Sequence, residues 1–185
     1  MTQLVFFLEE PSAEEMLKAV LPKFLPDAVE TQFIVFEGKQ DLEKRLFKKL
    51  RGWLWADARF IVLRDQDSGN CVEIKRRLKQ ICVDAGRPES LIRIACHELE
   101  SFYLGDLAAV AKAFQNPGIE KMQRKANYKK PDRLANPKQE LKKLIPQYQQ
   151  ISGSRDIAEW MNIDENKSHS FNILISGIKQ LVGNY

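Results

Sequence analysis

The chain has 185 residues, of which 44% are hydrophobic, and a formal net charge of +4. This length fits one domain or one domain with an extension, and the composition allows a sizeable core. The apolar runs are too short to span a bilayer and no basic stretch precedes a long apolar region, so we expect neither a membrane protein nor a secreted one. Three cysteines without a CxxC pair indicate reduced thiols in a cytoplasmic protein.

The first half of the sequence alternates predicted strands and helices. Apolar or β-branched runs of strand length occur at residues 4–8, 31–37, 60–63 and 91–96. Helical periodicity follows each run, and Ser12 and Glu15 have the spacing of a capping box at the start of the first helix. The helix after the fourth strand should be interrupted near Gly105. Four such units predict an α/β fold, a mostly parallel four-stranded sheet with helices on both faces.

The second half is proline-broken and basic. Helical stretches are predicted at residues 138–145, 154–161 and 170–182, and the last has an apolar face that should pack on the preceding domain. The predicted organisation is therefore an α/β domain at residues 1–115. A basic segment and a C-terminal helical extension at residues 116–185 should pack on that same domain.

Acidic residues follow three of the predicted strands. In chain order they are Glu9, Glu10, Asp65, Asp67, Glu98 and Glu100. Ligands of parallel α/β sheets bind at the carboxyl ends of the strands, where the strand order reverses. Carboxylates crowded there repel one another unless a cation compensates, and Mg²⁺ or Mn²⁺ prefers such oxygen ligands. In an extended segment residues i and i+2 point the same way, so Asp65 and Asp67 could share one metal ion.

Each acid also has an ordinary explanation. Asp and Asn are common in turns, and Asn70 could simply cap the next helix. Glu98 and Glu100 stand where a helix dipole attracts acids. Taken together, Glu9, Asp65 and Asp67 indicate a metal site and the catalytic residues. Further candidate ligands are Glu10, Glu98 and Glu100.

Basic charge is concentrated between Lys121 and Lys143. This stretch holds nine basic and two acidic residues, a local net charge of +7. Cations around an aromatic ring suit a phosphate backbone with a stacked base, although a solvated surface segment would look the same. The candidate nucleic-acid-binding residues are Lys121, Arg124, Lys125, Tyr128, Lys129, Lys130 and Arg133.

The arrangement of these acids resembles the Toprim fold, the metal-binding domain of topoisomerases, primases and related nucleases. That family has a glutamate after its first strand and a D-x-D after its third, which correspond to Glu9, Asp65 and Asp67. The Toprim glutamate is usually followed by glycine, whereas Glu10 stands here, so the choice between Glu9 and Glu10 as the ligand stays open. More closely, the chain is similar to a bacterial Toprim-like family without assigned function, in the stretches LEEPSAEEML, FEGKQDLEKRL, VLRDQDSGNC, ACHELESFYLGD, SRDIAEWM and NKSHSFNILISGI.

The resemblance implies a Mg²⁺-dependent phosphodiesterase that acts on DNA or RNA. It also implies an AAA-type ATPase as a partner, in phage-defence or mobile-element settings. The alternative is a non-catalytic or partner-gated subunit of such a defence complex. A third hypothesis, phosphatase chemistry on a small molecule, leaves the basic segment without a role.

Overall fold

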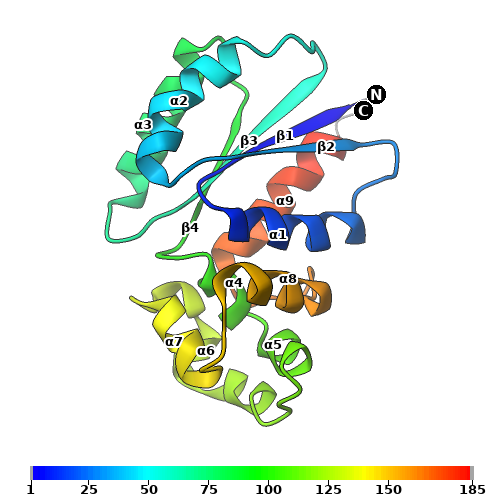
Figure 1. The fold of residues 1–185 in the computed structure, drawn as a ribbon, viewed down its shortest axis with the longest axis vertical. Coiled ribbons are helices and arrows are strands. Elements are labelled where there is room, and N and C mark those ends of the chain that lie inside the picture. The colour runs from blue at the N-terminus through cyan, green and yellow to red at the C-terminus, as the bar shows by residue number, and fades with distance from the viewer. Residues whose placement is uncertain (1, 184–185) are drawn as a thin grey trace.

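The computed structural model of the chain describes residues 2–183. Its centre is a four-stranded sheet in which every pair of neighbours is parallel and the order is β2-β1-β3-β4 (Figure 1). The strands are β1 (Gln3–Leu8), β2 (Glu30–Val35), β3 (Ala58–Asp65) and β4 (Leu91–Ala95). β1 lies between two strands and is buried along its whole length, as its continuous apolar sequence predicts. The predicted four-stranded parallel sheet is confirmed.

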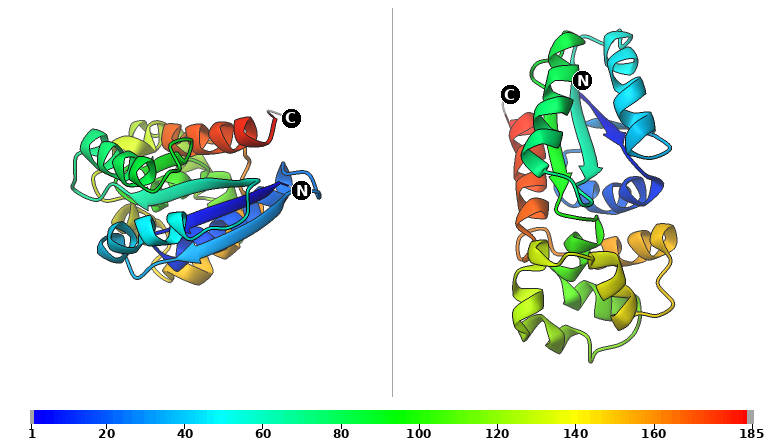
Figure 2. Two further views of the ribbon diagram at one scale, coloured as in Figure 1. Left: turned by 90° about the horizontal axis from the view of Figure 1, so that it is seen from above. Right: turned by 90° about the vertical axis from the view of Figure 1, so that its left-hand side faces the viewer.

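Helices cover both faces of this sheet. They are α1 (Pro11–Val20) and α9 (His169–Gly183) on one face, with α2 (Lys39–Arg51) and α3 (Cys71–Asp84) on the other (Figure 2). The side chains of a strand alternate between faces, so Leu4, Phe6 and Leu8 enter the core under α1 and α9. Val5 and Phe7 enter the core under α2 and α3.

The remaining helices form a layer beyond the carboxyl ends of the strands (Figures 1 and 2). They are α4 (Glu100–Leu104), α5 (Leu107–Ala113), η2 (Glu120–Arg124), α6 (Ala126–Lys129), η3 (Pro131–Arg133), α7 (Pro137–Leu144) and α8 (Gln150–Trp160), whereas η1 (Leu21–Lys23) directly follows α1. We call this the helical layer. α8 packs along α1, and Lys23 Nζ donates to the carbonyls of Ala158 and Met161, each at 2.8 Å. Apolar residues of the layer are continuous with the core under α1 and α9.

The helix predicted after β4 is indeed interrupted at Gly105. A Cβ on this glycine would lie 2.1 Å from Asn166 Oδ1 and 2.7 Å from the backbone nitrogen of Ser168. The break between α4 and α5 is therefore pressed against the segment that leads into α9, and only glycine leaves room for that contact.

Two predicted helix starts are wrong. α1 begins at Pro11 without the capping box, because the Ser12 hydroxyl donates to Glu10 Oε1 at 2.5 Å instead of capping the helix. Glu15, the other half of that box, pairs with Arg155 of α8. α8 starts at Gln150, earlier than the predicted residue 154. Within residues 2–183 no helix combines the length and the apolar character needed to cross a membrane.

Candidate functional site

The strand order reverses between β1 and β3, and this places the ends of both strands side by side. Leu8 pairs with Leu63 in the sheet, and the backbone nitrogen of Glu9 donates to the Leu63 carbonyl at 3.3 Å. The Glu9 side chain makes a second contact with β3, because its Oε2 accepts a hydrogen bond from the backbone nitrogen of Asp65 at 3.0 Å. Glu9 and Asp65 are therefore brought together, as expected from the sequence if the strands that they follow are neighbours.

Glu9 points to the face of the sheet that carries α2 and α3. It continues the alternation of Val5 and Phe7, and Arg64 Nε lies 3.7 Å from its Oε2. Arg64 is buried, with 4% of its surface exposed, and its Nη1 lies 2.5 Å from Glu43 Oε1. Burial raises the pKa of Glu9, while the Asp65 N–H and the charge of Arg64 oppose that rise. We call this region the Arg64 side.

Asp67 also lies on the Arg64 side, apart from Asp65. β3 ends at Asp65, and Asp67 has a φ of 53°, so the extended geometry that should align the two aspartates stops between them. Its carboxylate pairs with Lys39 Nζ at 2.7 Å and lines a cavity of about 370 Å³ between α2 and α3. The expectation that Asp65 and Asp67 point the same way is wrong, because the chain turns after the strand.

The turn chemistry considered for this loop is confirmed. Asn70 Oδ1 accepts from the backbone nitrogens of Val72 at 2.9 Å and Glu73 at 3.2 Å. Asn70 is thus the N-cap of α3 and satisfies two backbone donors of its first turn. The loop after β3 combines an ordinary cap with an acidic residue that has a cationic partner.

Asp65 points to the opposite face, toward the helical layer. It follows Ile61 and Leu63, which belong to the core under α1 and α9. Burial raises the pKa of Asp65 well above its usual range, and the charges of Glu10, Glu100 and Glu9 raise it further, against a hydrogen bond from the Leu99 N–H. We call Glu10, Asp65 and Glu100 the buried acidic group, in which Glu100 is buried and Glu10 and Asp65 are half-buried.

Glu100 is the most enclosed member of this group, with 1% of its surface exposed. Its Oε1 accepts from the Tyr148 hydroxyl at 3.1 Å, whereas its Oε2 is buried without a hydrogen-bond partner among the described residues. Desolvation raises the pKa of Glu100 to about 7. The neighbouring Ser101 Oγ and Tyr103 hydroxyl are likewise buried without a partner in the described part of the chain. Such orphaned polar atoms are rare in folded proteins and call for a physical reason.

The helical layer supplies residues that the sequence did not point to. Gln150 Nε2 donates to Glu10 Oε2 at 2.7 Å, and Lys138 Nζ donates to Gln150 Oε1 at 2.7 Å. Tyr148 reaches Glu100 from the same segment. These residues come from loops and helix starts of the second half, where no spacing or motif marks them. Only the requirement that buried acids need hydrogen-bond donors could have suggested a polar partner there.

Glu98 stands apart from the buried acidic group. Its Oε2 accepts from the backbone nitrogen of Lys138 at 2.8 Å, so it satisfies a donor at the start of α7. This is a capping role from a distant part of the chain. The structure thus brings Glu10, Asp65 and Glu100 together, joins Glu9 to them through the backbone of Asp65, and holds Glu98 and Asp67 elsewhere.

The donor set fits a hard divalent cation in its chemistry, because it consists of carboxylate oxygens, one of them buried without a partner. In the arrangement seen here, however, no group of three or more His, Cys, Asp and Glu side chains within residues 2–183 is placed so that it could hold a metal ion. The carboxylates are divided between the two faces of the sheet. Metal binding stays a prediction.

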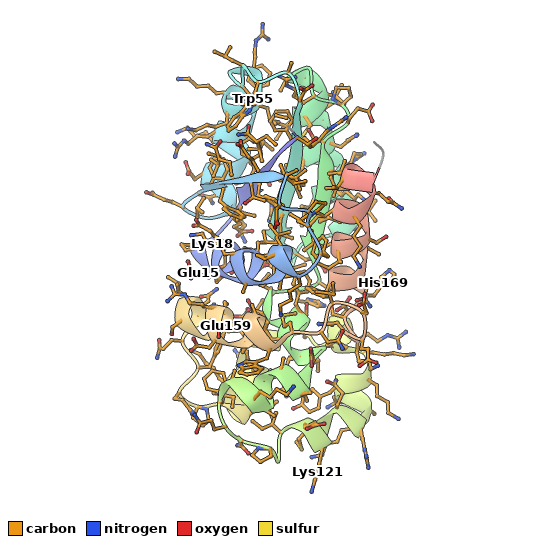
Figure 3. All side chains as sticks on the ribbon, turned by 90° about the vertical axis from the view of Figure 1, so that its right-hand side faces the viewer. Glu15, Lys18, Trp55, Lys121, Glu159 and His169 are labelled. Atoms are coloured by element: carbon orange, nitrogen blue, oxygen red, sulfur yellow. The ribbon has the colours of Figure 1, made fainter. Side chains whose placement is uncertain are left out.

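In the basic segment the candidate cations are exposed, whereas the aromatic residue between them is buried. The exposed cations are Lys121, Arg124, Lys125, Lys129, Lys130 and Arg133. Tyr128 is only 6% exposed, packs in the core and donates its hydroxyl to Glu140 at 3.5 Å. The prediction that Tyr128 stacks on a base is therefore wrong, since its ring is covered. Figure 3 shows Lys121 at one end of the molecule and Trp55 at the other.

Comparison with known proteins identifies the family of this chain but no individual similar protein. Neither the curated proteins nor the solved structures include a match to this chain. A family model described as "Domain of unknown function (DUF4276)" matches residues 8–179, which include both sides of the sheet edge and the whole helical layer. The chain is therefore a member of the DUF4276 family.

Proposed function

We propose that this chain is a Toprim-like, metal-dependent phosphodiesterase that acts on nucleic acid, with Mg²⁺ or Mn²⁺ at the buried acidic group. The observation that carries the proposal is the lack of compensation among these carboxylates. Asp65 lies near three other acids, and a buried oxygen of Glu100 has no partner among the described residues. Burying like charges together is costly, and perturbed carboxylates gathered in one place are typical of functional sites.

The buried acidic group would hold the cation through Asp65, Glu10 and Glu100. When bound, a divalent cation supplies charge neutralisation at a phosphoryl group and lowers the pKa of a water molecule. Burial raises the pKa of Glu9, and its carboxylate lies against the backbone of Asp65, an arrangement that suits a general base. Gln150 and Tyr148 would keep Glu10 and Glu100 in place.

The cations of the basic segment support a polyanionic substrate. Lys121, Arg124 and Lys125 are exposed in the helical layer, the same layer that closes over the buried acidic group. Contacts with phosphates should give binding that weakens steeply as salt increases.

Calorimetric titration of Mn²⁺ tests the metal site without a substrate. Asp65→Asn should abolish saturable binding, whereas Asp84→Asn, an exposed aspartate at the end of α3, should leave it unchanged. The Asp67→Asn variant tests which side of the sheet edge binds the cation. Its affinity for Mn²⁺ should fall only modestly if the cation sits at the buried acidic group. Equal binding by wild type and Asp65→Asn would refute the proposal. Cleavage of labelled DNA and RNA that requires Mn²⁺ and is lost in Asp65→Asn would then establish the activity.

A second candidate is a subunit gated by an AAA-type ATPase. Two observations favour it. Lys39 and Arg64 already engage Asp67 and Glu9, as expected of a resting state, and Leu54 and Trp55 are 96% and 48% exposed at the far end of the molecule. Size-exclusion chromatography with a candidate AAA-type ATPase should show a complex that a Leu54→Ser/Trp55→Ser variant loses. Nuclease activity of the isolated chain would exclude a requirement for the partner.

A further inference from the structure

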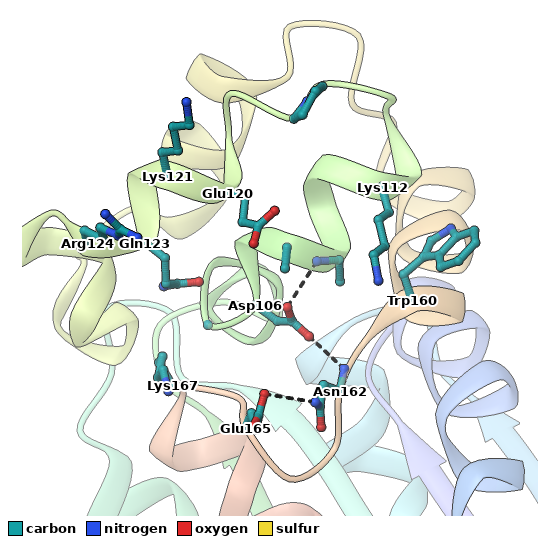
Figure 4. A pocket seen from close by; sticks show the side chains of 14 residues that line it. Asp106, Lys112, Glu120, Lys121, Gln123, Arg124, Trp160, Asn162, Glu165 and Lys167 are labelled. Carbon is teal, nitrogen blue, oxygen red and sulfur yellow. Dashed lines mark hydrogen bonds between the residues drawn. The ribbon is translucent and has the colours of Figure 1, made fainter.

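A cavity of about 720 Å³ lies in the helical layer, apart from the sheet edge. α5, η2 and the connection between α8 and α9 form its walls (Figure 4). Its volume is that of a small-molecule site, and the residues on its walls are mostly polar or charged. None of the roles described above uses it, except that Lys121 and Arg124 stand on its rim.

One wall presents an aromatic ring. Trp160, the last residue of α8, is 51% exposed, and Lys112 Nζ lies 5.6 Å from the centre of a ring of its side chain. A large aromatic residue left half-exposed at a cavity gives up burial energy that a core position would supply. The exposed indole ring of Trp160 can stack against a flat ring, as aromatic side chains stack against nucleic-acid bases.

The opposite wall presents cations. Lys121, Arg124 and Lys167 all lie on the side away from Trp160, with Lys121 above Arg124 and Lys167 below it in the view of Figure 4. All three side chains are exposed, and within residues 2–183 none has a side-chain hydrogen bond or ion pair. They are therefore available to an anionic group, and a phosphate is the anion that a guanidinium and an ammonium bind well.

Carboxylates stand between these two walls. Asp106 is fixed by the backbone nitrogens of Ala109 at 3.1 Å and Asn162 at 2.7 Å, and Glu120 points toward it (Figure 4). With Glu165, three acids face four cations across the cavity, so its net charge is only +1. A polyphosphate would meet repulsion here, whereas the hydroxyl groups of a sugar would find acceptors.

We propose that this cavity binds a nucleotide monophosphate unit. Its base stacks on Trp160, its sugar hydroxyls donate to Glu120 and Asp106, and its phosphate lies at Arg124 and Lys167. The unit is either a free mononucleotide or the nucleotide at the end of a strand. The inference deepens the nucleic-acid part of the proposed function, but it needs no metal and no hydrolysis.

The test is a binding titration in the presence of a chelator. Ribonucleoside 5′-monophosphates and a short 5′-phosphorylated single strand are titrated by calorimetry against wild type, Trp160→Ala and Arg124→Ala/Lys167→Ala. We expect each variant to bind about tenfold more weakly, the size expected for loss of one stacked base or of paired phosphate contacts. Binding of monophosphates assigns a free nucleotide, whereas binding of the strand alone assigns its terminal unit.

Matched controls come from the same chain. Lys48→Ala/Lys49→Ala removes two exposed cations of α2 outside the cavity, and Trp55→Ala removes an exposed tryptophan at the far end (Figure 3). Both should bind mononucleotides as wild type does. Asp65→Asn should also bind them normally, so a failed metal site and a failed nucleotide site give different results. Wild-type affinity in Trp160→Ala, or no binding by the native protein, would overturn the inference.

Discussion

On the Arg64 side of the sheet edge every carboxylate named above meets a cation, whereas on the opposite side the carboxylates meet mainly one another and neutral donors. Glu9 and Glu43 share the buried guanidinium of Arg64, and Asp67 pairs with Lys39. Across the sheet, Asp65 has Glu10, Glu100 and Glu9 as the charges that act on it most. The two sides are separated by a single alternation of side chains along β3, from Arg64 to Asp65.

The difference shows on which side of the sheet edge the charges are balanced within the chain. Paired charges on the Arg64 side are satisfied within the chain, so they need no further ligand. The buried acidic group has only neutral side chains, Gln150 and Tyr148, as its direct hydrogen-bond donors from the helical layer, and Lys138 is the cation whose charge acts on Glu100. Uncompensated charge of this kind lowers stability, and proteins keep it mainly where a ligand or a reaction uses it.

Breaking the pairing on the Arg64 side should have the largest effect on stability. Arg64→Met keeps an apolar stem but leaves Glu9 and Glu43 without their buried partner, and we expect the free energy of unfolding to fall by about 3 kcal/mol. Arg77→Met is the matched control, because Arg77 binds the same Glu43 at 2.8 Å from an exposed position and should cost under about 1 kcal/mol. Urea unfolding measures both. Equal losses would show that Arg64 is no more than a surface partner.

The buried acidic group should make stability fall as pH rises. The pKa of Glu100 is raised from 4.5 to about 7, so the folded state holds its proton more tightly than the unfolded state does. This stabilisation is complete below pH 4.5, is lost as pH rises to about 7 and stays lost above that, a change of roughly 3 kcal/mol. Asp65 acts in the same direction.

Glu100→Gln isolates the contribution of that residue. Unfolding free energies measured from below pH 4.5 to above pH 7 should fall less steeply for the variant than for wild type. Addition of Mn²⁺ to wild type should flatten its profile as well, since a bound cation favours the ionised carboxylate. Parallel profiles for the two proteins would contradict the assignment of a raised pKa to Glu100.

The parallel sheet could be predicted from the sequence because the signals of its strands are local, whereas the strand order could not. Residues 4–8 and 60–63 are continuous apolar runs, and the acids that follow them mark the strand ends. The division of the site could not be predicted, because it depends on where β3 stops being extended. Asp67 has the spacing of a partner for Asp65, yet its positive φ and the reach of Lys39 take it to the other face.

The contacts made by the helical layer were still harder to predict from the sequence. Tyr128 has the surroundings of an exposed stacking residue in the sequence, but in the structure its ring packs in the core, which its polar and basic sequence neighbours do not indicate. Gln150 and Tyr148 contact acids that are 140 and 48 residues away. No local pattern encodes such contacts, since a single glutamine or tyrosine carries no periodic signal. Trp160 was missed for the same reason.

Removing a donor from the buried acidic group should have a smaller effect. Gln150→Ala takes away the hydrogen bond to Glu10 and the link to Lys138, and we expect a loss of about 1 kcal/mol in the free energy of unfolding. Gln149→Ala, its exposed neighbour, should change stability by less than about 0.5 kcal/mol. If Gln150 also positions Glu10 for metal binding, its variant should bind Mn²⁺ several-fold more weakly. A loss of stability without a loss of affinity would make Gln150 purely structural.

The smallest effect on stability should come from the Lys39–Asp67 pair. Both side chains are partly exposed, so Lys39→Ala should lower the free energy of unfolding by no more than about 0.5 kcal/mol.

The effect of Lys39→Ala on Mn²⁺ affinity shows whether Asp67 belongs to the metal site. If Asp67 lies outside the metal site, affinity should stay within about twofold of wild type. If Lys39 withholds Asp67 from a site that both faces share, removing its ammonium should raise affinity several-fold, and Lys44→Ala, a nearby lysine of α2 without that partner, should not. The first outcome keeps the two sides of the sheet edge separate, whereas the second makes the Arg64 side the resting half of one metal centre.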